Sequence, residues 1–481
     1  RRAHELGQVQ GQDRVVGVEG LPPQQTAPPL RFVIGLFDIG DVVVIRNAQP
    51  HIEFRQPYGE FGAVAGDPAH RFVEAVGAGG AVRVHLEGDP VVAAAGGVAI
   101  VANWLLLFVP LGMAAQWLHW GSLAVFTLNF LAIVPLAKLL GDATEQVSMP
   151  LGPALGGLLN ATFGNAVELI VGVVALLQGQ LRVVQMSLVG SILSNLLLVL
   201  GLSFFVGGIY QPENTFAQTA AQASGSIMTL GCFTMVLPAA YWGSVKNGNT
   251  DKDIFSTAFS SLGASRAPLE KPAPGTFDAL GGILFISRGT AVILLLIYVG
   301  YLFFQLRTHS FLYESPTREQ DEQEEQPDMS PQASILALLI ITLITSVNAD
   351  YLVSAIDDVA NNYGISKVFI STILLPIVGN AAEHVTSVWM AAKDKMEIVL
   401  GVSVGSSVQI CLGLVPVLVL VGWAVGQPLT LYFHDFETIN LVVSVLLVNS
   451  LIQDGKSNYL EGALLVALYL VISLSFWVSP S

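Results

Sequence analysis

The chain has 481 residues, of which 53% are hydrophobic and only 12% are charged. Soluble globular chains carry about 25% charged residues, so this composition excludes an ordinary soluble protein. The formal net charge of −15 argues against nucleic acid as a partner, because phosphate binding requires basic patches.

The first segment, residues 1–95, differs from the rest of the chain. It mixes Gly, Pro, Val and scattered charges without a sustained period, and the chain starts at Arg1. A composition of this kind is typical of segments that do not pack a core. We interpret the region as disordered or as an unreliable gene model, with a small soluble domain as the alternative.

From residue 96 onward, continuous apolar segments predict an all-α polytopic membrane protein, since about 20 apolar residues cross a bilayer as a helix. Hydropathy indicates about 11 transmembrane helices. The expected organisation is a leading helix and loop, a first repeat of five helices, an acidic linker and a second repeat of five helices, at 96–121, 122–306, 307–332 and 333–478 respectively. The expected loop between the fifth and sixth helices covers about residues 243–288.

The linker contains the acidic run ESPTREQDEQEEQPDMSP at 314–331, which includes Asp321, Glu322, Glu324 and Glu325. A solvated charge run needs no function. A helix that senses Ca²⁺ is the other interpretation, and we favour this regulatory role.

An internal repeat is the most informative feature. GNAVELIVGV starts at Gly164 and GNAAEHVTSV at Gly379, an offset of 379 − 164 = 215. The same offset relates further pairs, namely Glu168 and Glu383, Gly190 and Gly405, Ser191 and Ser406, and Asp142 and Asp357. The two glutamate helices are the third and eighth spans, so they cross the membrane in opposite directions. Inverted repeats of this kind build transporters with a substrate site near the midplane.

The two glutamates require a neutralising partner. A charge near the bilayer centre costs at least about 2.5–3.5 kcal/mol, and no basic residue lies near Glu168 or Glu383 in the sequence. Asn165 and Asn380 each lie three residues before a glutamate, on the same helix face. Folding the halves together would gather an all-oxygen set that also includes Ser191, Ser406 and Gln409. Ca²⁺ prefers such ligands, and Mn²⁺ also accepts them.

Proton coupling follows from the same pair of carboxylates. Two of them facing one cavity cannot both stay charged once the cation leaves, so protons would compete with the cation for Glu168 and Glu383. His384 adjoins Glu383 and titrates near neutral pH. A proton relay and a histidine simply bonded to a neighbour are both open interpretations of His384.

Three aspartates belong to the seventh span, Asp350, Asp357 and Asp358. They would either line an ion access route or be ordinary interfacial charges, and we favour interfacial charges.

These residues resemble a known family. GNAVELIVGVVAL and GNAAEHVTSV resemble the paired alpha repeats of the calcium/proton exchangers, a branch of the cation/Ca²⁺ antiporter superfamily. LNFLAIVPLAKLLGDATEQVS, GSILSNLLLVLGL, GSSVQICLGLVPV and LIQDGKSNYLEG extend the likeness over about residues 97–478. It is most similar to fungal vacuolar members.

The resemblance implies Ca²⁺/H⁺ antiport by alternating access, which loads Ca²⁺ into an acidic compartment. It implies Glu168 and Glu383 as central ion-binding carboxylates, and a multi-pass protein of the vacuolar membrane or of another acidic intracellular compartment. Ca²⁺ is then a transported substrate, no resident cofactor is expected, and a homo-oligomer stays open.

Other functions were weighed against this one. An exchanger for Mn²⁺/H⁺ or one driven by Na⁺ is the nearest alternative. An intramembrane enzyme would need a nucleophile with a base, or a metal held by His and carboxylate, and the spans hold neither arrangement at the repeat; we therefore predict that the protein is not an enzyme. A sensor that binds Ca²⁺ without moving it is the third alternative.

Overall fold

The computed structural model describes residues 43–46, 72–77, 80–87, 103–246, 279–312 and 329–479. The chain divides into two compact units, residues 1–100 and 101–481. In the first unit the described residues form a three-stranded sheet of β1 (Val43–Arg46), β2 (Phe72–Gly77) and β3 (Gly80–Glu87). The strand order is β1-β3-β2, with β1 parallel and β2 antiparallel to β3. The N-terminal region therefore contains a small sheet.

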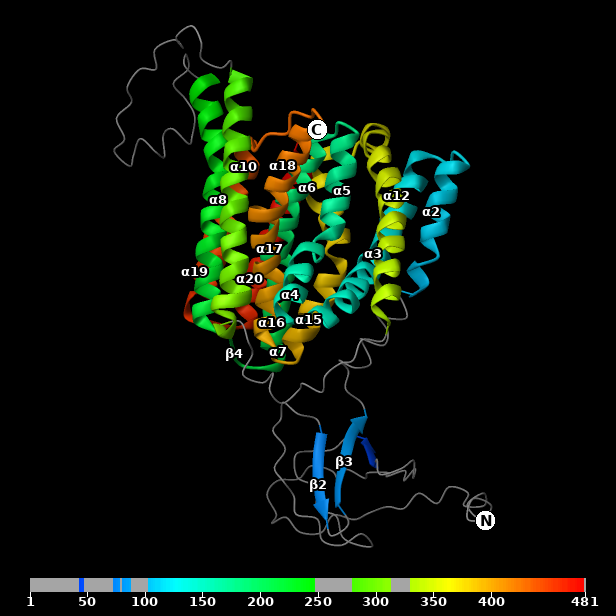
Figure 1. Cartoon of the computed structure of the whole chain (residues 1–481), viewed down its shortest axis with the longest axis vertical. Helices are drawn as coiled ribbons and strands as arrows, with labels where there is room; N and C mark the ends of the chain where they lie inside the picture. Colours follow the sequence, from blue (N-terminus) through cyan, green and yellow to red (C-terminus); the bar gives the residue numbers. More distant parts are fainter. Residues whose placement is uncertain are drawn as a thin grey trace, which may run out of the picture. The chain divides into compact units, whose positions relative to one another are not determined.

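The second unit is a helical bundle (Figure 1). Its first half contains α2 (Phe108–Trp117), α3 (Ser122–Ser148), α4 (Gly152–Phe163), α5 (Ala166–Leu177), α6 (Leu181–Leu193), α7 (Leu200–Tyr210), α8 (Gln218–Lys246) and α10 (Ala279–Phe303). Its second half contains α12 (Pro331–Tyr363), α13 (Lys367–Phe369), α14 (Leu375–Gly379), α15 (Ala381–Ala392), α16 (Met396–Leu400), α17 (Ser406–Gln409), α18 (Val415–Ala424), α19 (Asp435–Leu451) and α20 (Tyr459–Trp477).

Short segments of other geometry join these helices. Within the described ranges, three are 3₁₀ turns, η2 (Met149–Leu151), η5 (Ser310–Leu312) and η9 (Ile452–Asp454). Five in the same ranges are π-helical, η3 (Ser194–Val199), η4 (Phe304–Thr308), η6 (Ile370–Leu374), η7 (Gly401–Gly405) and η8 (Ile410–Leu414). Two residue pairs, β4 (Asn214–Thr215) and β5 (Lys456–Ser457), form a small antiparallel ladder.

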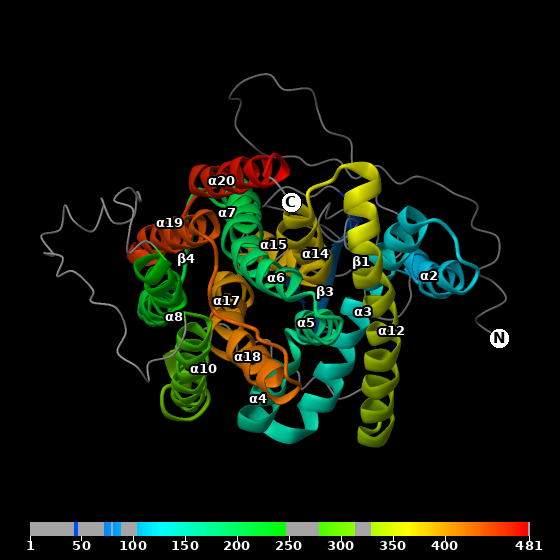
Figure 2. The ribbon, with the colours of Figure 1, turned by 90° about the horizontal axis from the view of Figure 1, so that it is seen from above.

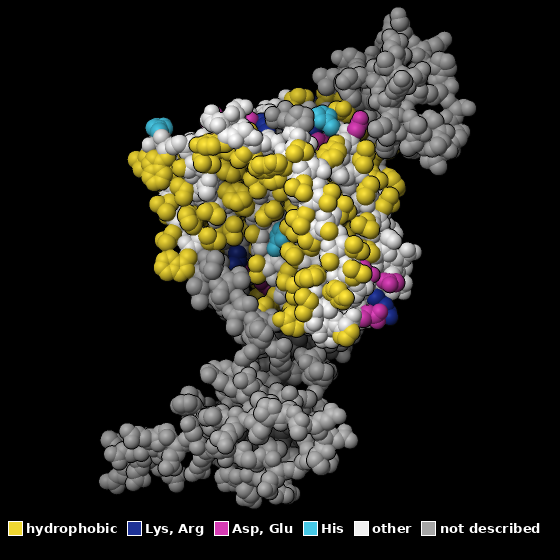
Figure 3. All heavy atoms as spheres, turned by 180° about the vertical axis from the view of Figure 1, so that it is seen from behind, with side chains coloured by type: hydrophobic (Ala, Val, Ile, Leu, Met, Phe, Trp, Pro, Cys, Tyr) yellow, Lys and Arg dark blue, Asp and Glu magenta, His cyan; other side chains and the backbone are white. Residues whose placement is uncertain are grey.

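The bundle has the proportions of a membrane protein. Among the described residues, eight helices are long and apolar enough to cross a bilayer, and the pair Lys367–Gly379 and Ala381–Ala392, bent by 57°, makes a ninth. The shorter helix α2 and the pair α4 and α5 occupy the two remaining predicted spans, so the count of eleven stays a prediction. Hydrophobic side chains cover most of the face shown in Figure 3, as lipid contact requires.

The inverted repeat is visible in the helix boundaries. α5 and α15 have the same length, and both their ends differ by 215 residues: 381 − 166 at the start and 392 − 177 at the end. The same offset separates the last residues of α3 and α12, Ser148 and Tyr363. It also separates the first residues of α6 and α16, Leu181 and Met396. α5 lies in the upper half of Figure 1 and α15 in the lower half. Because each forms the second half of its span, the two spans run in opposite directions, as predicted.

The two repeats approach most closely where α6 passes η6. A Cβ added at Gly190 would lie 2.1 Å from the backbone oxygen of Thr372. Only glycine permits this approach, and Figure 2 shows α5, α6, α14 and α15 near the centre of the bundle. A Cβ at its repeat counterpart, Gly405, would meet its nearest atom only at 3.8 Å, so the close approach occurs in one repeat alone.

One predicted loop is too long. The expected loop at 243–288 includes the first turns of α10, which begins at Ala279. Polar residues there suggested a loop, but they have partners in the fold. Ser287 accepts a hydrogen bond from the Leu431 N–H at 2.9 Å, and Arg288 lies 4.8 Å from the centre of the Trp423 ring. Tertiary contacts thus stabilise a helix that the local sequence does not indicate.

Candidate ion-binding site

Each glutamate follows a break in a membrane-spanning helix. α4 ends at Phe163 and α5 begins at Ala166, while α14 ends at Gly379 and α15 begins at Ala381. Asn165 and Asn380 form the breaks, with φ/ψ of −102°/31° and −89°/11°. A break leaves backbone groups without helical partners and places the positive end of a helix dipole beside the next turn. Both glutamates lie in that first turn.

The two carboxyl groups are neighbours across the repeat interface. A Cβ added at Gly379 would lie 3.0 Å from Glu168 Oε1, so the first glutamate packs against the break of the second repeat. Glu383 lies close enough to Glu168 for the two carboxylates to interact electrostatically. Both side chains are half-buried. The fold thus unites the two acids that the repeat predicted as a pair.

Each break asparagine donates a hydrogen bond to the opposite repeat. Asn165 Nδ2 donates to Gln409 Oε1 at 2.7 Å, and Asn380 Nδ2 donates to Asn195 Oδ1 at 3.0 Å. The Oδ1 atoms of Asn165 and Asn380 are buried and make no hydrogen bond. Buried carbonyl oxygens without a donor are costly, and a bound cation would satisfy them. These two oxygens are the strongest structural indication of an ion site.

Ser406 completes the second half of the site. Its hydroxyl donates to Glu383 Oε1 at 3.2 Å, and Asn195 lies beside the same carboxyl group. Ser191, the repeat counterpart of Ser406, is buried on α6, but within the described part of the chain its hydroxyl forms no hydrogen bond with Glu168. The two serines predicted as equivalent are therefore not equivalent in this conformation.

A cavity of about 440 Å³ lies against the site. Glu383, Ser406 and Gln409 line it, together with residues of both repeats, namely Ala137, Leu140, Gly141, Gly157, Asn160, Phe163, Gly164, Val167, Gln305, Leu306, Gly379, Ala382, Thr386, Gly401 and Val402. The labelled elements that contribute, α4, α15 and α17, lie in the central and lower part of the helical bundle in Figure 1. The second glutamate thus faces a space large enough for a hydrated cation.

His384 is bonded on both ring nitrogens. Nδ1 lies 2.6 Å from the Asn380 carbonyl oxygen, and Nε2 lies 3.4 Å from Ser194 Oγ of the first repeat. A carbonyl oxygen only accepts, so Nδ1 carries a hydrogen and Nε2 can accept one. The ring is bonded to a neighbour, as one of the two interpretations held, and a proton relay through it stays a prediction.

The sequence interpretation missed several polar residues of the site. Asn195 is fully buried and bonded to Asn380, and Gln305 lines the cavity from η4. The only signal for Asn195 was the polar pair Ser194–Asn195 within an apolar span. Nothing in the sequence predicted that Gln305 lines the cavity, because its position depends on the geometry of η4 at the end of α10.

The donor set fits a transported hard cation. Among the described residues, no group of three or more His, Cys, Asp and Glu could hold a metal ion. The site instead combines two carboxylates with neutral amide and hydroxyl oxygens, which bind Ca²⁺ in a flexible shell. Such a site can release its ion, as transport requires.

Two of the outer aspartates accept hydrogen bonds from the opposite repeat. Asp350 Oδ1 accepts from Gln178 at 2.7 Å and Asp357 Oδ2 from Gln180 at 2.6 Å, while Asp357 also pairs with Lys367 of its own repeat at 2.5 Å. Asp358 is exposed. These contacts agree with interfacial charges. The acidic segment with Asp321, Glu322, Glu324 and Glu325 lies outside the described residues.

Inverted repeats whose broken helices bring two acids together beside a cavity are typical of secondary transporters. Residues 121–307 and 333–478 match the family described as "Sodium/calcium exchanger protein". The "Vacuolar calcium ion transporter" of Schizosaccharomyces pombe is 46% identical over 378 residues, which cover 79% of this chain and 85% of that protein. The "Ca(2+)/H(+) antiporter" of Synechocystis sp. is 40% identical over 390 residues, with 78% and 97% covered. The chain belongs to the sodium/calcium exchanger family.

Solved structures agree with this assignment. The structure of native YfkE is 32% identical, with a TM-score of 0.62, and the match covers 79% of this chain and all of that one. The structure of the "H+/Ca2+ Exchanger CAX" is 12% identical with a TM-score of 0.51 and supports the fold alone. The all-α membrane fold is confirmed, and family membership confirms a transporter rather than an enzyme.

Proposed function

We propose that this protein exchanges Ca²⁺ for H⁺ across an intracellular membrane and loads Ca²⁺ into an acidic compartment. The observation that carries the proposal is the pair of glutamates from inverted repeats, gathered beside two buried amide oxygens that lack donors. The names of the relatives from Schizosaccharomyces pombe and Synechocystis support Ca²⁺ and H⁺ as the two ions that are exchanged. The vacuolar name of the fungal relative supports the vacuolar membrane as the location.

The geometry suggests how one site serves both ions. Ca²⁺ would be held by the carboxylates of Glu168 and Glu383, the Oδ1 atoms of Asn165 and Asn380, and the hydroxyl of Ser406. When Ca²⁺ leaves, two adjacent carboxylates repel each other in a region poor in water. Protons then neutralise the two carboxylates. The site without Ca²⁺ is therefore protonated when it changes from one side of the membrane to the other in accessibility. Competition between the ions for the same oxygens couples their movements.

Flux measurements in sealed proteoliposomes test the proposal. An imposed pH gradient, acidic inside, should drive ⁴⁵Ca²⁺ uptake, and a protonophore should abolish it. Uptake that requires Na⁺ and ignores pH would refute proton coupling. Uptake of Mn²⁺ in preference to Ca²⁺ would assign the same mechanism to a different substrate, and Ca²⁺ binding without any flux would indicate a sensor.

Two finer parts of the proposal need their own measurements. Joint replacement of Asp321, Glu322, Glu324 and Glu325 by Asn or Gln should change the Ca²⁺ dependence of uptake if the segment regulates transport. Light scattering on detergent-solubilised protein would show whether copies associate into a homo-oligomer.

A further inference from the structure

A second, smaller space, the outer cavity, lies beside the ion cavity. It has a volume of about 130 Å³, and residues of α8, of α10 and of the span Met396–Ala424 line it. Gln305 and Gly401 belong to the lining of both cavities. The outer cavity therefore adjoins the ion cavity at these two residues.

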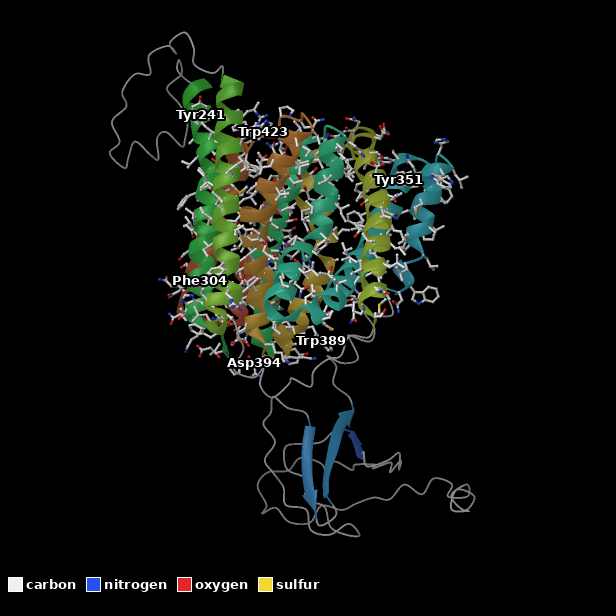
Figure 4. All side chains as sticks on the ribbon, in the orientation of Figure 1. Tyr241, Phe304, Tyr351, Trp389, Asp394 and Trp423 are labelled. Carbon is white, nitrogen blue, oxygen red and sulfur yellow. The ribbon has the colours of Figure 1, made fainter. Side chains whose placement is uncertain are left out.

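Glu397 is the single charged residue in the described lining of the outer cavity. It lies in the first turn of α16 and is partly exposed. Within the described ranges its carboxylate forms neither a hydrogen bond nor an ion pair. In Figure 4, Phe304, next to Gln305, and Asp394, three residues before Glu397, are both labelled in the lower half of the bundle. The outer cavity thus carries one negative charge toward this end.

Two glycines keep space open between Glu397 and the ion cavity. Gly401 and Gly405 line the outer cavity from the same span as Glu397. A Cβ added at Gly401 would meet nothing within 4 Å, and one at Gly405 would meet its nearest atom at 3.8 Å. The span therefore leaves room for an ion at Gly401, where the two cavities adjoin.

The equivalent position of the first repeat carries the opposite charge. Arg182 is the counterpart of Glu397, since 397 − 182 = 215, and it forms an ion pair with Glu437. These two residues and Lys367 line a separate cavity of about 540 Å³, whose described lining shares no residue with the ion cavity. In this conformation the ion cavity therefore adjoins the space that holds a lone acid and not the space that holds two basic residues.

We propose that Glu397 and Gln305 form an outer station that captures the divalent cation and passes it to the ion site. The carboxylate of Glu397 attracts the hydrated cation into the outer cavity. Gln305 Oε1 then replaces part of the hydration shell while the ion moves past Gly401 toward Glu383. The inference rests on the proposed transport function and adds to it the residues of the access route.

The chemistry of the two side chains suits this role. Carboxylate and amide oxygens are both ligands of Ca²⁺, and one water molecule takes about 30 Å³ of liquid volume, so the outer cavity can hold a cation with several of its waters. A single carboxylate a few ångströms from a divalent cation in water changes its occupancy about three- to tenfold. Salt weakens such an attraction, so the station holds the ion weakly enough to release it inward.

Transport kinetics test the role of Glu397. Glu397→Gln should raise the half-saturating Ca²⁺ concentration about three- to tenfold, leave the maximal rate within about twofold, and reduce the effect of salt on half-saturation. Glu397→Asp keeps the charge and should restore most of the affinity. Glu213→Gln is the matched control, because Glu213 pairs with Lys456 and lines neither cavity. Unchanged half-saturation in Glu397→Gln, or an equal increase in Glu397→Asp, would overturn the proposal.

Cysteine labelling supplies a readout that needs no flux. A cysteine at Gly401, with Cys232 and Cys411 replaced by alanine, would be treated with a cationic and with an anionic methanethiosulfonate reagent. Each rate is divided by the rate of the same reagent with a small free thiol. The cationic reagent should react faster, and adding Glu397→Gln should reduce this preference about three- to tenfold, whereas adding Glu213→Gln should leave it unchanged.

The labelling experiment separates this inference from the proposed function. A Gly401→Cys variant that reacts with neither reagent would refute an open route at Gly401. A preference that Glu397→Gln does not alter would refute the capture role of Glu397. A wild-type protein without proton-driven flux would refute the proposed function, while the labelling rates would still decide whether Glu397 attracts cations toward the ion cavity.

Discussion

Glu168 and Glu383 meet where two helix breaks of opposite direction lie side by side. The packing of Glu168 against Gly379 and the bond from Ser406 to Glu383 fix both carboxylates at one junction. When a divalent ion binds there, carboxylate and amide oxygens replace the water molecules of its hydration shell. This replacement is favourable only while both glutamates are charged. The acids therefore act as a unit, and loss of either one should resemble loss of both.

Glu168→Gln and Glu383→Gln should each abolish proton-driven Ca²⁺ uptake. Glutamine keeps the shape of the side chain but removes the charge and the titrating proton. Since breaking a buried charge pair costs about 3–5 kcal/mol, Ca²⁺ affinity should fall roughly 100-fold or more, measured by ⁴⁵Ca²⁺ binding and flux. Glu213→Gln, at an exposed pair with Lys456, is the control, and normal flux in either site variant would contradict the prediction.

Gly379→Ala should impair transport without unfolding the protein. The added Cβ would lie 3.0 Å from Glu168 Oε1, so the carboxylate must shift within the ion site. Gly401 lines the same cavity, and a Cβ there would meet nothing within 4 Å. The expected result is a raised half-saturating Ca²⁺ concentration for Gly379→Ala and a normal one for Gly401→Ala; equal values in flux assays would argue against the placement of Glu168.

At the scale of elements, adding 215 to the residue numbers of helix boundaries in the first repeat gives the corresponding boundaries in the second. This regularity made the glutamate helices and their opposite directions predictable from sequence. The partners across the interface were not predictable, because the bond between Asn380 and Asn195 depends on how α6 and η3 pass α14. The early start of α10 and the five π-helical segments likewise arise from packing between helices rather than from local propensity.

Gly190→Ala should destabilise the bundle at the contact of α6 with η6. The new Cβ would lie 2.1 Å from the Thr372 backbone oxygen, so the helices must separate, at a cost of about 1–3 kcal/mol. Thermal unfolding in detergent should show a lower midpoint than wild type. Gly289→Ala on α10, where a Cβ meets nothing within 4 Å, should unfold at the normal temperature or above it, and an equal effect of the two variants would contradict this account.

At the scale of the whole molecule, every described contact of the ion site lies within the unit of residues 101–481. The family match also falls inside this unit, at 121–307 and 333–478. The three-stranded sheet of the first unit contributes no described residue to the site. The described residues of the candidate ion site therefore all belong to the second unit.

Removal of residues 1–95 should leave proton-driven Ca²⁺ uptake intact. The shortened chain keeps both repeats and every residue that lines the cavity. Flux per correctly inserted molecule in proteoliposomes is the appropriate measurement, with the full chain reconstituted in parallel. A shortened protein that inserts normally and transports nothing would assign an unforeseen role to the N-terminal unit.

The π-helical segments η3 and η8 occupy matching places in the two repeats. η3 contains Asn195, the partner of Asn380, and η8 begins directly after Gln409. A π turn accommodates one residue more than an α turn, and one residue advances a helix by about 100°. The number of residues in η3 and in η8 therefore determines the direction in which the later side chains of each span point. Shortening either segment by a single residue would rotate the apolar remainder of its helix relative to the ion pocket, even though no ligand had been changed.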